Sequence, residues 1–189
     1  MTVADLSPEQ LERDQRAAKE YGVLIDAVQA DMRDLSRLGA DCFDLVHQPY
    51  SINFIPDCSE VFEQVKRVLR TSGQYWLSFA NPFTMNTRQG DWNGSGYVLG
   101  GPYSGGAEVT YDDQDWVYDR QSNDPIQKPV EYRHNLAAVV DGLIDLDFSI
   151  QHLSDNSDMH PDGTATPGSW DHFVAFAPPW LTILACLEH

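Results

Sequence analysis

Two consecutive strand–helix–strand patterns in the first 80 residues constrain the fold of this chain more than any other feature of its sequence. In the first pattern, apolar strands at residues 2–4 and 24–30 flank a helical segment. Ser7-Pro8 begins that segment with a preferred capping residue and a proline suited to the first helical position. Gly22 ends it, because glycine readily adopts the left-handed conformation that follows a helix.

The second pattern follows directly. Residues 43–47 and 74–80 form short apolar runs, which we interpret as buried strands. Between them, apolar side chains recur at helical spacing over residues 61–69, after a capping sequence at 57–60 and before Ser72-Gly73. Strands that alternate with helices predict the α/β class: a Rossmann-like, mostly parallel sheet with helices on both faces.

The regular alternation stops at residues 82–127, which contain seven glycines and many aromatic side chains. Within them, short alternating runs at 108–111 and 116–120 flank an acidic turn and predict a hairpin. A segment of this length without a clear helix is usually a functional loop or a lid. We therefore interpret residues 82–127 as a β-rich insertion.

Regular structure resumes in the last third of the chain. An apolar stripe over residues 136–143 predicts a helix, residues 148–153 predict a strand, and residues 172–177 predict the last strand. The final residues, Leu187-Glu188-His189, resemble the start of a vector-encoded histidine tag. We expect a single domain over residues 1–186, with 187–189 as a tag remnant.

The charge of the chain restricts its partners. The formal net charge of −17 repels a phosphate backbone, so we expect a small-molecule substrate and no nucleic acid. No run of about 18 apolar residues predicts a membrane helix, and the first residues lack the pattern of a signal peptide. We expect a cytoplasmic protein that does not contact a membrane.

Cysteine and histidine spacing gives no sign of a metal site. The three cysteines form no C-x-x-C pair, which fits reduced thiols in the cytoplasm. His152, Asp155, Asp158, His160 and Asp162 cluster in the sequence, but their spacing matches neither a calcium loop nor a zinc site. We interpret them as a solvated acidic loop and predict no metal.

Residues that directly follow the predicted strands are the candidates for ligand binding, because open α/β sheets bind ligands beyond the carboxyl ends of their strands. Asp5 follows the first strand, and its carboxylate is suited to the hydroxyls of a ribose. Asp31 and Met32 follow the second, where an acid can accept from an adenine amino group and an apolar side chain can pack on the ring. The alternative is purely local: Asp5 as a pre-helix turn residue and Asp31 as a strand-end cap.

Four stretches of the sequence together resemble the class I S-adenosylmethionine-dependent methyltransferases. Residues 3–11 resemble the second strand and following helix of that family, and residues 28–35 its third-strand motif. Residues 43–46 resemble the fourth-strand motif, and residues 65–74 the helix and turn that lead into the fifth strand. The resemblance covers residues 2–80 well and 131–177 loosely.

This resemblance implies a cofactor, S-adenosylmethionine, and a role for each matching position. Asp5, with Leu6 beside it, would bind the ribose, Asp31 and Met32 would bind the adenine, and Gln48 would lie near the methionine portion or the methyl group. The methyl group would pass to a nucleophile by in-line displacement, in which the enzyme mainly positions the reactants. His47 and Tyr50 are candidate general bases.

The sequence departs from the family at its start, which corresponds to the second strand. The first strand and the G-x-G-x-G loop of the family have no counterpart, and the turns Gly94-Ser95-Gly96 and Gly100-Gly101 neither follow a strand nor precede a helix. The missing strand is central in the family sheet. We expect either that the strands at 2–4 and 43–47 pair directly, or that a partner chain covers the gap, as in a homo-oligomer.

Aromatic residues of the insertion are candidates for binding the methyl acceptor. Trp92 and Tyr97, with Trp170 and His172 from the end of the chain, could form an aromatic wall, or could pack only the core of the lid itself. The sequence thus predicts a methyltransferase acting on a small molecule. Two alternatives stay open: a non-catalytic remnant or interaction protein, and an NAD-dependent oxidoreductase, whose fold also places an acid after the second strand.

Overall fold

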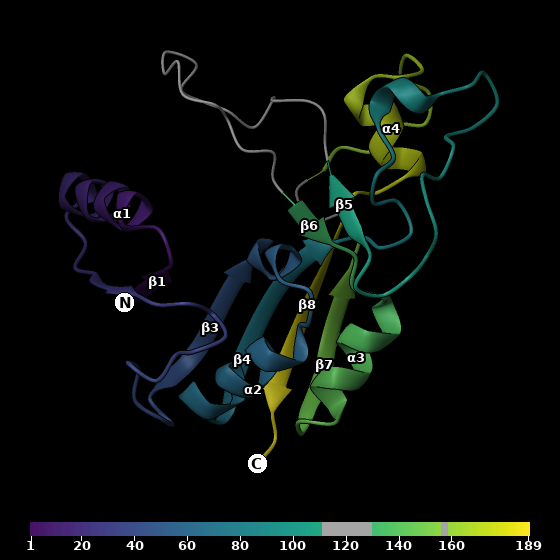
Figure 1. The fold of residues 1–189 in the computed structure, drawn as a ribbon. Helices are drawn as coiled ribbons and strands as arrows, with labels where there is room; N and C mark the ends of the chain where they lie inside the picture. Colours follow the sequence, from purple (N-terminus) through teal and green to yellow (C-terminus); the bar gives the residue numbers. More distant parts are fainter. Residues whose placement is uncertain (111–129, 156–158) are drawn as a thin grey trace.

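The computed structural model describes residues 1–110, 130–155 and 159–189 (Figure 1). In chain order, the elements are β1 (Thr2–Asp5), α1 (Pro8–Tyr21), β2 (Asp26–Gln29), β3 (Phe43–Pro49), the 3-10 helix η1 (Ser51–Phe54), α2 (Ser59–Val68), β4 (Leu69–Ala80), the 3-10 helix η2 (Gln89–Asp91), β5 (Glu108–Thr110), β6 (Val130–Tyr132), α3 (Leu136–Ile144), β7 (Phe148–Ser154), α4 (Trp170–Phe176) and β8 (Trp180–Leu187). Within the described ranges, no helix is long and apolar enough to cross a bilayer.

Four strands form the main sheet, in the order β3-β4-β8-β7 (Figure 1). β3 and β4 are parallel, whereas β8 is antiparallel to both β4 and β7. Three of the four strands therefore run in the same direction. The predicted α/β class, with a mostly parallel sheet, is confirmed.

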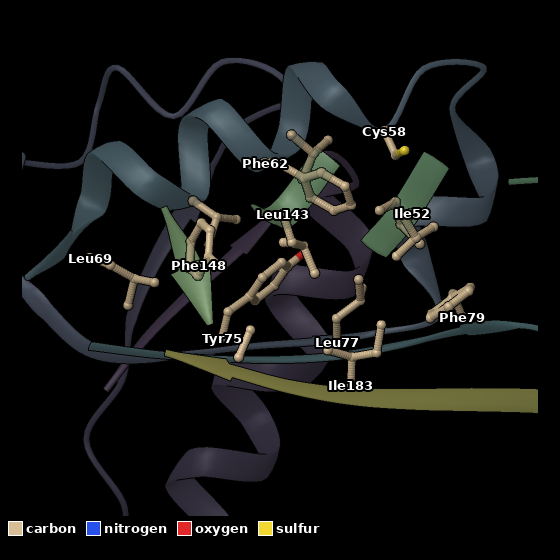
Figure 2. Packing of buried hydrophobic residues seen from close by; sticks show 14 of the residues in the cluster. Ile52, Cys58, Phe62, Leu69, Tyr75, Leu77, Phe79, Leu143, Phe148 and Ile183 are labelled. Atoms are coloured by element: carbon tan, nitrogen blue, oxygen red, sulfur yellow. The ribbon is translucent and has the colours of Figure 1, made fainter. Parts of the chain in front are cut away.

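One face of this sheet carries the core of the protein (Figure 2). Tyr75, Leu77 and Phe79 alternate along β4 and have no exposed surface, because α2 and α3 pack over them. Phe62 from α2 and Leu143 from α3 belong to the same cluster. Both helices thus cover the same face of the four-stranded sheet.

β1 and β2 form a separate parallel pair, with α1 packed on it. The expectation that the strands at 2–4 and 43–47 pair directly is wrong, because β1 bonds to β2 and β3 bonds to β4. The connection from β2 to β3 forms hydrogen bonds with side chains of α2. Arg67 Nη1 donates to the carbonyl of Leu38 at 3.1 Å, and Gln64 Oε1 accepts from the amide of Leu35 at 3.1 Å.

The insertion contributes one described strand, and its pairing differs from the prediction. β5 pairs in antiparallel fashion with β6, across the residues that the structure does not describe. The predicted partner, residues 116–120, lies outside the described residues. The buried guanidinium of Arg133 fixes this pair to the loops before it, since it donates to the carbonyls of Met85 at 3.0 Å and Gly100 at 3.2 Å. The alternating sequence pattern of a strand cannot predict such hydrogen bonds between residues far apart in the chain.

The end of the chain corrects a second prediction. Residues 172–177 are not a strand: they belong largely to α4, whose first turn is capped by Ser169 Oγ accepting from the amide of His172 at 3.4 Å. The last strand is β8, after Pro178-Pro179. Leu187 ends β8 and is 3% exposed, so this residue of the expected tag remnant is part of the fold.

Candidate functional site

An open groove of about 390 Å³ lies where β1 and β2 end. Both strands are parallel, so their carboxyl ends meet at one edge, as expected for a ligand site in an α/β protein. Leu6 and Asp31, two of the predicted cofactor residues, line it. The complete lining is Leu6, Gln29, Ala30, Asp31, Asp34, Ser36 and Arg37.

Asp31 contributes an ionised carboxylate to this groove. Its Oδ1 accepts from the amide and from Nε of Arg33 at 2.9 and 3.0 Å, and its Oδ2 accepts from Arg33 Nη2 at 2.6 Å. The hydrogen bond from the Arg33 side chain is the main reason that the pKa of Asp31 is lowered. The carboxylate is 29% exposed and can accept a further hydrogen bond from a ligand.

Asp5 serves the local structure and does not line the groove. Its Oδ1 accepts from the amide of Ser7 at 2.8 Å, just before α1, as a pre-helix turn residue does. The backbone of the next residue, Leu6, is held by Gln29 Nε2, which donates to the Leu6 carbonyl at 3.1 Å. Leu6 and Asp31 therefore both line the groove, whereas Asp5 is not part of its lining.

Met32 and Gln48 meet next to the groove. Gln48 Nε2 donates to Met32 Sδ at 3.3 Å and to Ser51 Oγ at 3.0 Å. Gln48 Oε1 accepts from the hydroxyl of Tyr75, a residue of the buried core. This network joins the segment that follows β2 to β3, and it fixes the Gln48 amide in one orientation.

The two candidate bases lie in different places. His47 is on the face of β3 opposite Gln48, where its ring lies 5.2 Å from that of Trp76. Tyr50 has a left-handed backbone, with φ of 60°, and begins the turn from β3 into η1. Its ring packs against a small cluster that includes Met85 and Val109 of the insertion.

Tyr50 has a partner that the sequence did not reveal. Its hydroxyl donates to Glu131 Oε2 at 2.7 Å, and Glu131 is 7% exposed in β6. The two residues are 81 positions apart, and no local motif marks Glu131. A carboxylate held against a tyrosine hydroxyl can orient that hydroxyl and draw its proton.

The predicted aromatic residues do gather in one cluster around α4. Tyr97 and His172 share a hydrogen bond of 2.7 Å between the hydroxyl and Nδ1, and the ring of Trp92 lies 4.7 Å from that of His172. Trp170 lies at the edge of this cluster, 5.9 Å from Phe173 and 39% exposed. His172 is 3% exposed, so it packs the interior of this unit, whereas Trp170 is partly open to solvent.

No group of three or more histidine, cysteine, aspartate or glutamate side chains is placed to hold a metal ion in the part of the chain that the structure describes.

Comparison with known proteins finds similarity to methyltransferases. Residues 1–77 match the family model described as a methyltransferase domain. This first part of the chain is similar to a methyltransferase domain. The uncharacterized methyltransferase YbaJ of Bacillus subtilis is 33% identical over 82 residues, which is 43% of this chain and 32% of that protein. The chain thus spans about a third of the length of this curated methyltransferase relative.

Solved methyltransferase structures share the fold. An S-adenosylmethionine dependent methyltransferase from Mesorhizobium loti is 22% identical with a TM-score of 0.71, over 98% of this chain and 79% of that one. Another, from Clostridium acetobutylicum, is 17% identical with a TM-score of 0.65, over 100% of this chain and 75% of that one. At these identities the likeness establishes the fold.

Proposed function

We propose that this chain binds S-adenosylmethionine in the groove at the ends of β1 and β2 and takes part in methyl transfer to a small molecule. The observation that carries the proposal is the position of Asp31, whose ionised carboxylate lines an open groove at the carboxyl edge of a parallel strand pair. The match of residues 1–77 to a methyltransferase domain supports it.

The residues of the groove fit the nucleoside half of this cofactor. Asp31 supplies a carboxylate acceptor for an amino group, and Leu6 supplies apolar surface, being 65% exposed. The volume of the groove lies within the range of small-molecule sites. The strongly negative chain also attracts a cationic cofactor.

The neighbouring network fits the reacting end. When bound, S-adenosylmethionine supplies an electrophilic methyl group. Gln48 is held by Met32, Ser51 and Tyr75, so its amide is a rigid positioning group beside the groove. Tyr50 donates its hydroxyl proton to Glu131, so its oxygen could take a proton from an acceptor while its own proton passes to the Glu131 carboxylate.

The aromatic cluster supports a small, partly apolar acceptor. Trp170 is the most exposed of the predicted acceptor residues, and it lies against Trp180 at 5.7 Å. The negative charge of the chain disfavours nucleic acid as the acceptor. We therefore propose Trp170 as the acceptor contact, with His172 and Tyr97 as the packing behind it.

Calorimetric titration tests this proposal. We expect S-adenosylmethionine, and not NAD, to give a saturable heat with the whole chain. Asp31→Asn should weaken the affinity by roughly tenfold, because it removes a charged hydrogen-bond acceptor. Asp147→Asn is the matched control: Asp147 is also paired to a cation, Lys66 at 2.7 Å, but does not line the groove, and its replacement should leave the affinity unchanged.

Two results would contradict the proposal. Saturable binding of NAD alone would favour an oxidoreductase. Absence of heat with either ligand at high protein concentration would favour a non-catalytic interaction protein.

A further inference from the structure

Two exposed tryptophans lie against each other near the end of the chain. Trp170 is the first residue of α4 and Trp180 is the first residue of β8, and their ring centroids are 5.7 Å apart at an angle of 48°. The two side chains are 39% and 41% exposed, although tryptophan is highly buried on average. Adjacent exposed aromatic rings of this size are typical of an interaction site.

The strand register places this pair at the edge of the main sheet where ligands bind. Trp180 is the register partner of Ala80, the last residue of β4. The amide of Asn81 donates to the carbonyl of Pro179 at 2.8 Å, which fixes the start of β8 beside the end of β4. Because β8 is antiparallel to β4, its first residue lies at the carboxyl end of β4, and Figure 1 shows α4 beyond the same end of the sheet. α/β proteins bind ligands at this end.

The part of the chain that carries the pair is strongly acidic. Residues 134–189 include eight aspartates and glutamates and no lysine or arginine. Asp171 directly follows Trp170 and is exposed. The amide of Asp162 donates to the carbonyl of Asp171 at 3.0 Å, so a second exposed acidic residue belongs to the same loop and helix start. Hydrogen bonds from the hydroxyl and the amide of Thr164 lower the pKa of Asp162 and keep its carboxylate ionised.

A third acidic residue follows β7 at the same edge of the sheet. Asp155 comes directly after Ser154, which is the register partner of Thr182 in β8. Thr182 is two residues from Trp180 along that strand. The exposed aromatic pair therefore belongs to an acidic end of the sheet.

An organic ammonium ion is the class of ligand that fits both properties. The face of an indole ring is negative and attracts a cation that lies within about 6 Å of the ring centroid. The two centroids are 5.7 Å apart, so one cation can lie within this distance of both rings. Carboxylates nearby raise the local concentration of cations and repel anions. A neutral apolar ligand would be stabilised by the rings alone.

We infer that Trp170 and Trp180 form a binding site for an organic ammonium ion, with Asp171 as the carboxylate beside it. The exposed surfaces of the two rings contact the alkyl groups of the cation, and Asp171 supplies the opposite charge. This site makes the methyl acceptor a small molecule that carries an ammonium group. That assignment of the acceptor rests on the proposed function, whereas binding of the cation does not.

Choline and its uncharged analogue, in which carbon replaces the nitrogen, test this inference because they share a shape and differ in charge. Each compound is titrated into the whole chain while NMR follows the indole N–H signals of the five tryptophans. We expect choline to shift the signals of Trp170 and Trp180 saturably, and the uncharged analogue to bind at least about fivefold more weakly. The signal of Trp76, which is 47% exposed but pairs with Leu184 farther along β8, should not shift.

Substitutions separate the contribution of the rings from that of the charge. Trp170→Leu should weaken choline binding by about fivefold, because one ring is lost, and Trp170→Phe should weaken it less. Trp76→Leu is the matched control, since it replaces a similarly exposed tryptophan outside the pair, and it should leave the affinity unchanged. Asp171→Asn should weaken binding and reduce its dependence on salt. Asp147→Asn, at the opposite end of β7, should change neither.

Three results would overturn the inference. Equal affinity for choline and its uncharged analogue would identify a purely apolar surface. Equal effects of Trp170→Leu and Trp76→Leu would place the binding elsewhere. Signals of Trp170 and Trp180 that shift with protein concentration alone would identify a second copy of the chain as the occupant.

The outcome can be distinguished from that of the proposed function, because none of these measurements involves S-adenosylmethionine. Choline binding by a chain that gives no heat with S-adenosylmethionine would contradict the proposed function and leave the ammonium site intact. Heat with S-adenosylmethionine and no shift with choline would contradict the ammonium site alone.

Discussion

The two faces of β4 have the same strand geometry and opposite surroundings. On one face, Tyr75, Leu77 and Phe79 are fully buried under α2 and α3. On the other, Trp76 is 47% exposed, although it is the largest side chain of the strand. Both faces are apolar, so composition alone does not decide which is covered. Coverage is decided by which helices the topology places there, and the described helices α2 and α3 share one face.

The largest expected effect is on the covered face. Leu77→Ala should lower the free energy of unfolding by about 2–5 kcal/mol, because it removes buried methyl groups and leaves a cavity that the sheet cannot fill. Denaturant unfolding of the whole chain measures this difference. A loss below about 1 kcal/mol would mean that the face under α2 and α3 is loosely packed.

Thiol chemistry compares the faces without changing the core. Cys58 belongs to the covered cluster, and burial, aided by the nearby charge of Asp57, raises its pKa from 9.0 to about 11. Near neutral pH its thiolate fraction is then about a hundredfold lower than that of an ordinary thiol. Cys186 lies on the other face, opposite Gln74, and is only half-buried.

A chromogenic disulfide reagent should therefore modify Cys186 well before Cys58. Cys186→Ser should remove one fast phase, and Cys58→Ser should remove only the slow one. Equal rates for the two thiols would show that Cys186 is protected as well as Cys58.

The smallest expected effect is on the exposed face. Trp76→Ser should change the free energy of unfolding by less than about 1 kcal/mol, because half of the side chain is already in water and its ring contact is with exposed His47. The same denaturant titration used for Leu77→Ala measures it. A loss as large as that of Leu77→Ala would show that this face is covered in solution.

The elements with strong local signals were predicted well. Ser7, Pro8 and Gly22 mark the ends of α1 closely, since Ser7 caps it and Gly22 adopts φ of 68° after it. The stripe at Leu136–Leu143 is α3. Residues 172–177 were misassigned because a short, apolar, aromatic run suits a strand as well as a helix, and the cap from Ser169 gave the weaker signal.

Part of the candidate groove can be named from the sequence, whereas its role in cofactor binding stays a prediction. Strand ends identified Asp31 and Leu6, which line the groove, and Met32 and Gln48, which meet beside it. The contact between Tyr50 and Glu131 was missed, because it joins β3 to a strand after the insertion. Asp5 could not be separated from Asp31 by sequence, since both are acids at strand ends and only their orientation distinguishes them.

The sequence by itself determined the order of strands and helices, the α/β class and the acids at the strand ends, because caps, periodicity and charge are local properties of the chain. Only the tertiary structure decided which strands pair, which face of β4 is buried and which polar groups meet. These depend on hydrogen bonds and packing between residues far apart in the chain, such as Tyr75 with Gln48 and Arg133 with the carbonyl of Met85. The separation of β1 from β3 is of this second kind, since nothing in either strand records the identity of its neighbour.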